Sequence, residues 1–306
     1  MEKQQKITAK RVVWTSFLVD ISDVLLNVFV VFITGSVVVL AEAFQGLADL
    51  LASFLLVIGV RRSKRVADRI HPYGYGRELY FWTLISGLIM FSITATASVY
   101  FGWKRLLNPQ PVDNIILALA ILAIGVATNG YSFTLSYRRL VGDRGIRHLW
   151  GIFMHSSVAE TKTAMVLDLM GTLAALIGFV TLVIYHFTGD LRLDGLGAII
   201  IGIMLGFLSI VLLRGTKELL VGASAQPEVE DQIKRIVKAV PEVTSVIGLN
   251  TVYIGPKKLL VNLEVNLKNG LTTDEIERIT DIIQTRVKNK IPSVHDTQVE
   301  LESPKV

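Results

Sequence analysis

The chain has 306 residues, of which 51% are hydrophobic and only 19% are charged. This composition is too apolar for an ordinary soluble domain and predicts a multi-pass protein embedded in a lipid bilayer. The absence of cysteine excludes disulfides and thiolate metal ligands, so oxygen and nitrogen would have to hold any metal. The net charge of +5 does not indicate nucleic-acid binding, because the excess Lys and Arg fall in loops beside apolar stretches.

Six stretches are long and apolar enough to cross a bilayer, which takes about 20 residues. They are Val12–Ile33, Val37–Val60, Tyr80–Trp103, Asn114–Leu135, Thr163–Phe187 and Leu193–Leu213. The first is too long for a signal-peptide core, so we expect a retained helix and no cleavage. Lys and Arg gather before the first stretch and after the second and fourth, which predicts that both termini lie in the cytoplasm or the equivalent compartment of an organelle. In a prokaryote the membrane would be the plasma membrane.

The remainder of the chain predicts a small soluble domain, so we expect a transmembrane domain over 1–214 and a cytoplasmic domain over 215–306. A helix is expected from Pro227, and the β-rich runs "SVIGLNTVYIG" and "LLVNLEVNLK" are separated by the hairpin signal "GPKK". An amphipathic helix follows with Thr273 as its expected N-cap, and "HDTQVELE" predicts a last strand. The order αββαβ predicts a ferredoxin-like α+β domain with both helices on one face of the sheet.

Acidic and amide side chains recur inside three of the apolar stretches. They are Glu42, Gln45 and Asp49 in the second stretch, Asp20, Asp23 and Asn27 in the first, and Asp168 in the fifth. An ionisable residue at the bilayer centre costs on the order of ~3 kcal/mol, so each needs a compensating partner. One interpretation is that these acids are protonated or hydrogen-bonded and serve only helix packing. The other is a cation site between the second and fifth stretches.

In the second interpretation Asp49 and Asp168 supply negative charge and Gln45 supplies a neutral oxygen ligand. Because carboxylates must lose their protons to bind metal, the return of protons to the same acids would drive metal release. Glu42, one turn from Gln45, is either a ligand on the exit side or the proton-carrying group. Glu160 is a candidate ligand at the mouth of the fifth stretch.

At this point the residues resemble the cation diffusion facilitator family of transporters. The loop "HPYGYGRELYFW" is similar to the HP(Y/F)G(Y/F) loop that enters span three of that family, and "NPQP" and "LDGLGAIIIGIMLGFLSIVLL" fit as well. The resemblance covers about Val12 to Glu302 and is closest to the branch of the mitochondrial-type zinc transporter. It implies a proton-coupled antiporter that exports a divalent cation by alternating access. It also implies a homodimer joined partly through the tail, with no prosthetic group and no enzyme activity.

Two departures from the family pattern leave the transported ion open. Typical zinc exporters of the family have D-x-x-x-D on span two and H-x-x-x-D on span five, whereas these frames here run from Gln45 to Asp49 and from Ala164 to Asp168. Zinc prefers imidazole beside carboxylate, and an all-oxygen site suits harder ions such as manganese or iron(II). Asp20 and Asp23 are possible accessory or proton-coupling acids, and a single helix does not say whether they face the same cavity.

The loop after span two holds Asp68 and His71, a position that binds zinc in some family members. Tyr75 stands where such a site has its second histidine, so we interpret "HPYGYG" mainly as a structural turn.

Two other functional classes stay open. A degenerate family member could be a transport-inactive regulatory or partner subunit, since Gln45 and Ala164 replace ligands. A membrane enzyme is the third class, but the sequence has no HExxH, nucleophile elbow or P-loop.

Overall fold

The computed structural model describes residues 9–141 and 159–303, without the side chains of residues 9–16, 19 and 159–162. The chain forms two compact units. One contains the residues up to Arg61 together with Leu79–Lys217, and the other contains Arg62–Glu78 together with the residues from Glu218 onward. The sequence did not indicate that the loop 62–78 would cluster with the C-terminal domain.

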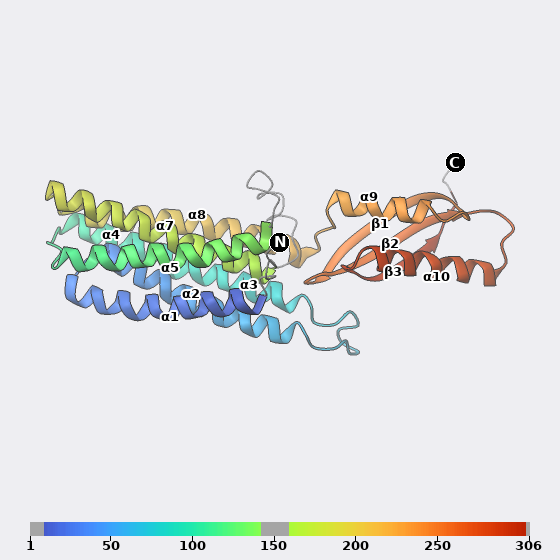
Figure 1. Cartoon of the computed structure of the whole chain (residues 1–306), viewed down its shortest axis with the longest axis horizontal. Helices are drawn as coiled ribbons and strands as arrows, with labels where there is room; N and C mark the ends of the chain where they lie inside the picture. Colours follow the sequence, from blue (N-terminus) through green and yellow to red (C-terminus); the bar gives the residue numbers. More distant parts are fainter. Residues whose placement is uncertain (1–8, 142–158, 304–306) are drawn as a thin grey trace, which may run out of the picture. The chain divides into compact units, whose positions relative to one another are not determined.

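Long helices running side by side build the first unit (Figure 1). They are α1 (Ala9–Thr34), α2 (Val37–Arg62), α3 (Glu78–Ile89), η1 (Met90–Ala95), α4 (Thr96–Leu107), α5 (Ile115–Val141), α7 (Ala159–Thr188) and α8 (Arg192–Val221). The segments α3, η1 and α4 follow one another without a break, and η1 is a π-helical insertion in this third long helix.

Within residues 9–141 and 159–303, five helices are long and apolar enough to cross a membrane. They are α2, the continuous segment Glu78–Leu107, α5, α7 and α8. The remaining expected stretch, Val12–Ile33, does form a helix, α1, but its role as a membrane span stays a prediction. The predicted class, a membrane helix bundle followed by an α+β domain, is confirmed.

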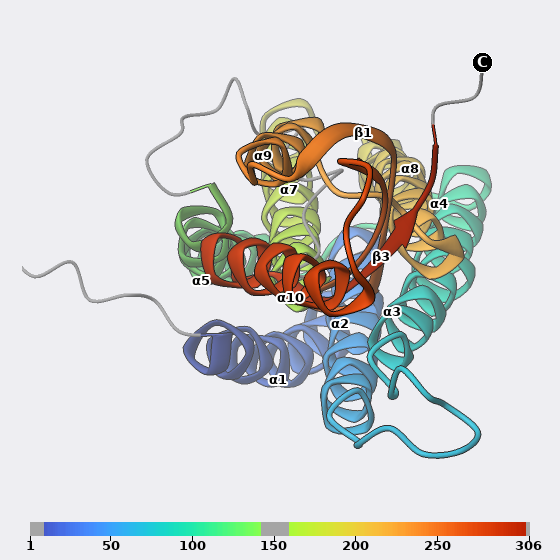
Figure 2. The ribbon, with the colours of Figure 1, turned by 90° about the vertical axis from the view of Figure 1, so that its right-hand side faces the viewer.

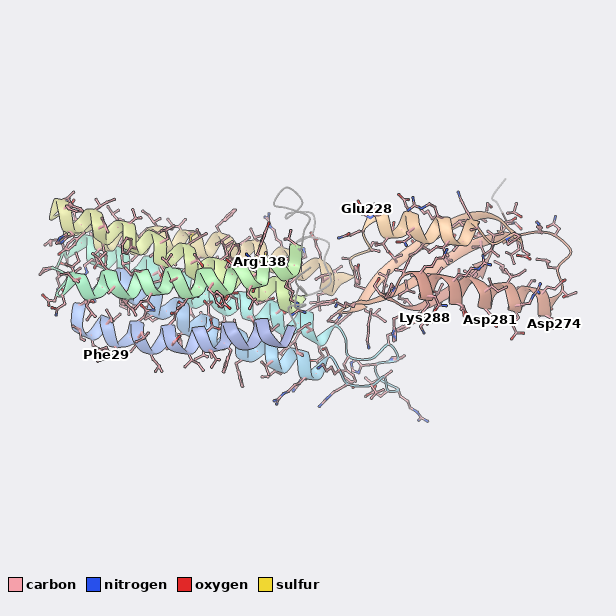
Figure 3. All side chains as sticks on the ribbon, in the orientation of Figure 1. Phe29, Arg138, Glu228, Asp274, Asp281 and Lys288 are labelled. Atoms are coloured by element: carbon pink, nitrogen blue, oxygen red, sulfur yellow. The ribbon has the colours of Figure 1, made fainter. Side chains whose placement is uncertain are left out.

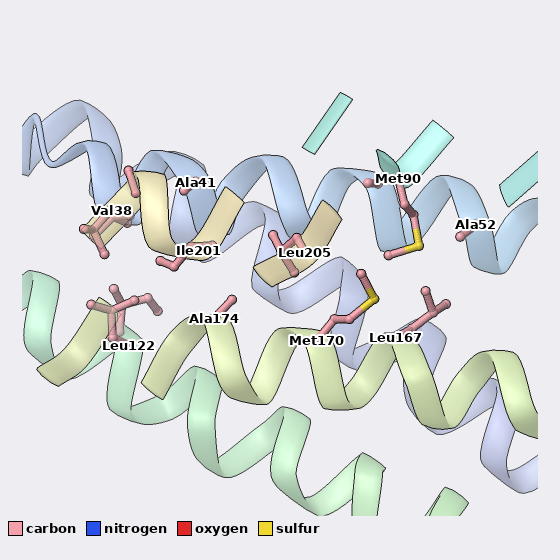
Figure 4. Packing of buried hydrophobic residues seen from close by; sticks show 14 of the residues in the cluster. Val38, Ala41, Ala52, Met90, Leu122, Leu167, Met170, Ala174, Ile201 and Leu205 are labelled. Atoms are coloured by element: carbon pink, nitrogen blue, oxygen red, sulfur yellow. The ribbon is translucent and has the colours of Figure 1, made fainter. Parts of the chain in front are cut away.

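Small and aliphatic side chains fill the interior of the bundle. Val38, Leu122, Ala174, Ile201 and Leu205 belong to one buried cluster contributed by α2, α5, α7 and α8 (Figure 4). Large apolar side chains such as that of Phe29 point outward instead, as expected for helices that face lipid (Figure 3).

Close backbone contact holds α4 against α8. A Cβ built on Gly102 would lie 2.7 Å from the carbonyl oxygen of Gly195, and a Cβ on Gly195 would lie 2.7 Å from the carbonyl oxygen of Gly102. A Cβ at either position would clash with the opposite backbone, so only glycine fits at both. Small residues of this kind let membrane helices approach closely. The third long helix and α8 are therefore packed backbone against backbone.

The C-terminal unit has the element order that the sequence predicts. It contains α9 (Pro227–Lys238), β1 (Val243–Gly255), β2 (Lys258–Leu267), α10 (Thr273–Lys290) and β3 (Val294–Leu301). The sheet order is β1-β2-β3, with β1 and β2 antiparallel and β2 and β3 parallel. The helices α9 and α10 contact each other and lie on the same side of the strands (Figure 2).

The N-cap of α10 corrects one expectation. The cap is Thr272, not Thr273: its hydroxyl accepts from the backbone N–H of Glu275, and the Glu275 carboxylate accepts from the backbone N–H of Thr272 at 2.8 Å. A capping box needs an acidic or amide side chain three residues after the cap, and only Thr272 meets that requirement here.

Candidate metal centre

One face of α2 carries three buried polar side chains, Glu42, Gln45 and Asp49. Their spacing along the helix places them on the same side, as the sequence predicts. The amide nitrogen of Gln45 donates to both carboxylate oxygens of Asp49, each at 2.9 Å. The amide oxygen of Gln45 consequently points away from Asp49, and it has no hydrogen-bond partner among the described residues.

Hydroxyl groups from neighbouring helices hold two further acids. Ser136 on α5 donates to the Oδ2 atom of Asp168 on α7 at 2.9 Å. Ser53 on α2 donates to the Oδ2 atom of Asp20 on α1 at 2.7 Å. Both carboxyls are buried. Because a hydroxyl group is neutral, these hydrogen bonds stabilise the negative charge of a carboxylate but do not cancel it.

The fifth acid, Asp23 on α1, is bound by an amide from α5. The Nδ2 atom of Asn129 donates to its Oδ2 atom at 2.5 Å. Gly171 on α7 leaves room for this amide, because a Cβ at Gly171 would lie 2.8 Å from the Oδ1 atom of Asn129. The Asp23–Asn129 bond therefore depends on a glycine in a third helix.

Three helices thus bring five carboxyls into one interior. Asp49 lies within electrostatic range of Asp20, Asp23 and Asp168, and Glu42 lies within range of Asp23. No basic side chain in the described ranges is at ion-pair distance from Asp20, Asp23, Glu42 or Asp49. When ionised, these groups repel one another, and a bound cation or protons would relieve that repulsion.

The described side chains are not arranged as a closed metal site. Within residues 9–141 and 159–303, no three His, Cys, Asp or Glu side chains are close enough to hold a metal ion together. Gln45, Asp49 and Asp168 therefore stay a predicted ligand set. Glu160 lies in the first turn of α7, but its side chain is outside the described part.

The loop between α2 and α3 is organised around the carboxylate of Asp68. One oxygen accepts from the backbone N–H groups of Ile70 and His71 at 2.9 and 2.7 Å, and the other accepts from the Tyr75 hydroxyl at 2.7 Å. The hydrogen bond from Tyr75, followed by the one from His71, lowers the pKa of Asp68, and the same bond to Asp68 raises the pKa of Tyr75. This geometry fits the structural turn, and metal binding by Asp68 and His71 stays a prediction.

An ion pair that the sequence did not predict lies at the opposite end of α2. Asp194 in the first turn of α8 contacts Arg105 on α4, with 3.0 Å between Oδ2 and Nε. The same carboxylate accepts from the hydroxyl of Ser36 at 2.6 Å and from the backbone N–H groups of Val37 and Val38. We call this arrangement of Ser36, Arg105 and Asp194 the α2 clasp. The signal in the sequence was a basic residue at the end of the third span and an acid at the start of the sixth.

Comparison with known proteins identifies the family. The family model "Cation efflux transmembrane domain" matches residues 13–221, and "Cation efflux protein, cytoplasmic domain" matches residues 225–304. The chain is 28% identical over 242 residues to the mitochondrial proton-coupled zinc antiporter SLC30A9 of Xenopus laevis, which covers 78% of this chain and 43% of that protein. The chain thus spans less than half the length of this relative.

A second relative matches along most of both chains. The cation-efflux pump FieF of Shewanella oneidensis is 28% identical over 275 residues, 88% of this chain and 87% of that protein. A solved structure of the MamM C-terminal domain in a nickel form covers 26% of this chain and 100% of that chain, at 24% identity and a TM-score of 0.25. With both family models matched in order along its length, this multi-pass membrane protein belongs to the cation efflux, or cation diffusion facilitator, family.

Proposed function

We propose that this protein moves a divalent metal cation across its membrane in exchange for protons. The observation that carries the proposal is the buried group of carboxyls on α1, α2 and α7, four of which have no basic partner in the described part of the chain. A permeating cation would supply the missing positive charge. Proton binding within this group of acids would favour its release, because a metal ion and protons compete for the same negative charge.

The metal ligands in this proposal are Gln45, Asp49 and Asp168. Only the amide oxygen of Gln45 can bind a metal, whereas its nitrogen now faces Asp49. Metal binding therefore requires the Gln45 amide to turn, which breaks both hydrogen bonds to Asp49 and frees the carboxylate.

The ligand chemistry and the relatives favour different ions. The relative SLC30A9 is named as a zinc antiporter, which supports zinc. The set of Gln45, Asp49 and Asp168 offers only oxygen, which suits manganese or iron(II) better. The substrate is accordingly zinc or one of these harder ions.

The remaining features of the proposal come from topology and the family. Both termini face the cytoplasm or its equivalent, metal leaves that compartment, and the protein works as a homodimer. The matched C-terminal domain supports the homodimer.

The test is uptake of zinc, manganese and iron(II) into inside-out proteoliposomes with an imposed pH gradient. We expect native protein to take up one ion, and Asp49→Asn and Asp168→Asn each to reduce its initial rate at least about tenfold. Asp113→Asn is the matched control, because it removes an exposed carboxyl outside the buried group. Unchanged uptake in Asp49→Asn and Asp168→Asn would contradict the ligand set.

The same experiment examines the alternative of a transport-inactive subunit. That alternative expects no uptake of any ion by the native protein, and activity only after Gln45→Asp and Ala164→His are combined to restore the ligands of typical zinc exporters.

A further inference from the structure

Two buried polar groups on α1 and α2 take no part in the proposed metal site. Glu42 is 3% exposed and Asn27 is 4% exposed. The helices α1 and α2 run antiparallel, since Ser53 contacts Asp20 while Gly46 packs against Val24. This register places Asn27 and Glu42 nearer the α1–α2 turn than Asp20 and Asp49.

The hydrogen bonding of these groups is incomplete. The Oε1 atom of Glu42 and the Oδ1 atom of Asn27 each have no hydrogen-bond partner among the described residues. Asp23, one turn from Asn27 on the same helix face, is held by Asn129 and is the charged neighbour of Glu42. A buried carboxylate oxygen without a donor is costly, and a proton on Glu42 would both remove its charge and convert it into a donor.

A proton suits this place better than a second metal ion. A metal needs several oxygen atoms that converge on one point. The amide N–H of Asn129 already occupies one oxygen of Asp23. A proton needs only one carboxylate and one acceptor, and both Asp23 and the Asn27 oxygen can accept.

We propose that Glu42 and Asp23 form a proton-binding site separate from the metal ligands Gln45, Asp49 and Asp168. This inference rests on the proposed function and assigns the proton half of the exchange to its own residues. The proton binds to the Glu42 carboxylate from one aqueous side and leaves to the other side as the metal arrives.

Asp23 couples this proton site to the metal site. It lies within electrostatic range of both Glu42 and Asp49, and Asp20 and Asp168 are the other charged groups that face Asp49. A divalent cation at Asp49 repels positive charge at Asp23 and Glu42, so metal binding favours proton release. Proton binding in turn weakens the hold on the metal, since coupling between two sites is reciprocal.

The test compares native protein with Glu42→Gln, which keeps the size of the side chain but cannot carry the proton. Choline is the only monovalent cation in the vesicles apart from protons. We expect the metal affinity of Glu42→Gln to lie within about threefold of that of native protein. We expect the same of its rate of metal exchange down a metal gradient. It should lose pH-driven accumulation, and proton release per bound metal, followed with a pH dye in weak buffer, should fall. Glu42→Asp is the conservative control and should retain pH-driven accumulation.

Each contrary result has its own meaning. Full pH-driven accumulation in Glu42→Gln overturns the proton site while leaving the proposed function intact. Loss of metal binding equal to that in Asp49→Asn also overturns it, because Glu42 would then be a ligand. If Glu42→Gln fails to fold, Asp23→Asn serves as the second variant. It too should lose pH-driven accumulation of metal, and full accumulation in Asp23→Asn would overturn the proton site. Absence of metal flux in native protein overturns the proposed function and this inference together.

Discussion

Replacing Asp194 by alanine should destabilise the membrane unit more than any exposed substitution. The Asp194 side chain is fully buried, at 0% exposure, and Arg105 is 7% exposed. The change leaves the Arg105 guanidinium buried without its counter-charge, and breaking a buried ion pair from one side costs about 3–5 kcal/mol. It also removes the acceptor of two backbone N–H groups in the first turn of α2, and a lost helix cap costs about 1 kcal/mol.

Two remaining contacts reduce this loss. Arg105 also donates to the backbone oxygen of Gly35 and to the Oε1 atom of Gln110, so its positive charge keeps polar partners. Contributions from one network are not additive, so we expect Asp194→Ala to lower the free energy of unfolding by about 3–5 kcal/mol in total. The double variant Arg105→Met with Asp194→Ala removes both charges and should recover about 1–2 kcal/mol of that loss, because an apolar pair avoids the unpaired buried charge.

The measurement is the free energy of unfolding of the full protein in mixed detergent micelles, for native protein and both variants. Asp113→Asn is again the control for an exposed carboxyl. A loss below about 1 kcal/mol in Asp194→Ala, or a double variant as unstable as the single one, would refute the view that the α2 clasp stabilises the bundle through its ion pair.

Three further changes test individual contacts. Thr272→Ala should lower the free energy of opening of α10 by about 1 kcal/mol in hydrogen exchange, and Thr273→Ala should change it much less, because only Thr272 caps the helix. The hydrogen-bonded Asp68 carboxylate has a lowered pKa, so exchange protection of the two amides that donate to it should be full at neutral pH and disappear as pH falls through that pKa; equal exchange at all pH values would contradict this. Gly171→Ala should reduce metal uptake by displacing the amide that binds the α1 carboxyl, whereas Gly130→Ala should be tolerated, since its Cβ would meet only a methyl group at 3.7 Å.

Much of the fold follows from local patterns in the sequence, and the ends of helices show where such patterns fail. The last apolar stretch predicts a helix that ends at Leu213, but α8 continues to Val221. Hydropathy reports where a chain leaves the membrane, whereas a helix continues as long as its backbone bonds are satisfied. The polar residues after Leu213, such as Arg214 and Lys217, are good helix formers.

The acids of the candidate site could be predicted from the sequence, but their partners could not. The spacing of Glu42, Gln45 and Asp49 along one helix is visible in a single segment. Ser136 and Asn129 look like ordinary residues of an apolar span, and their roles exist only where α5 meets α7 and α1. Contacts between helices distant in the chain depend on packing, which the periodicity of one helix does not contain.

The α2 clasp and the buried carboxyls on α1, α2 and α7 differ in a way that bears on the proposed exchange of cation and protons. At the clasp the acid Asp194 has a permanent cation, Arg105, which suits a fixed joint between helices. At Asp20, Asp23 and Asp49 the donors in the described part of the chain are neutral hydroxyl and amide groups, which stabilise a carboxylate but leave its charge in place. A basic side chain there would hold the position that a transported cation must occupy. Acids supported only by neutral donors remain available to a metal ion or a proton, and this is the property that exchange of the two requires.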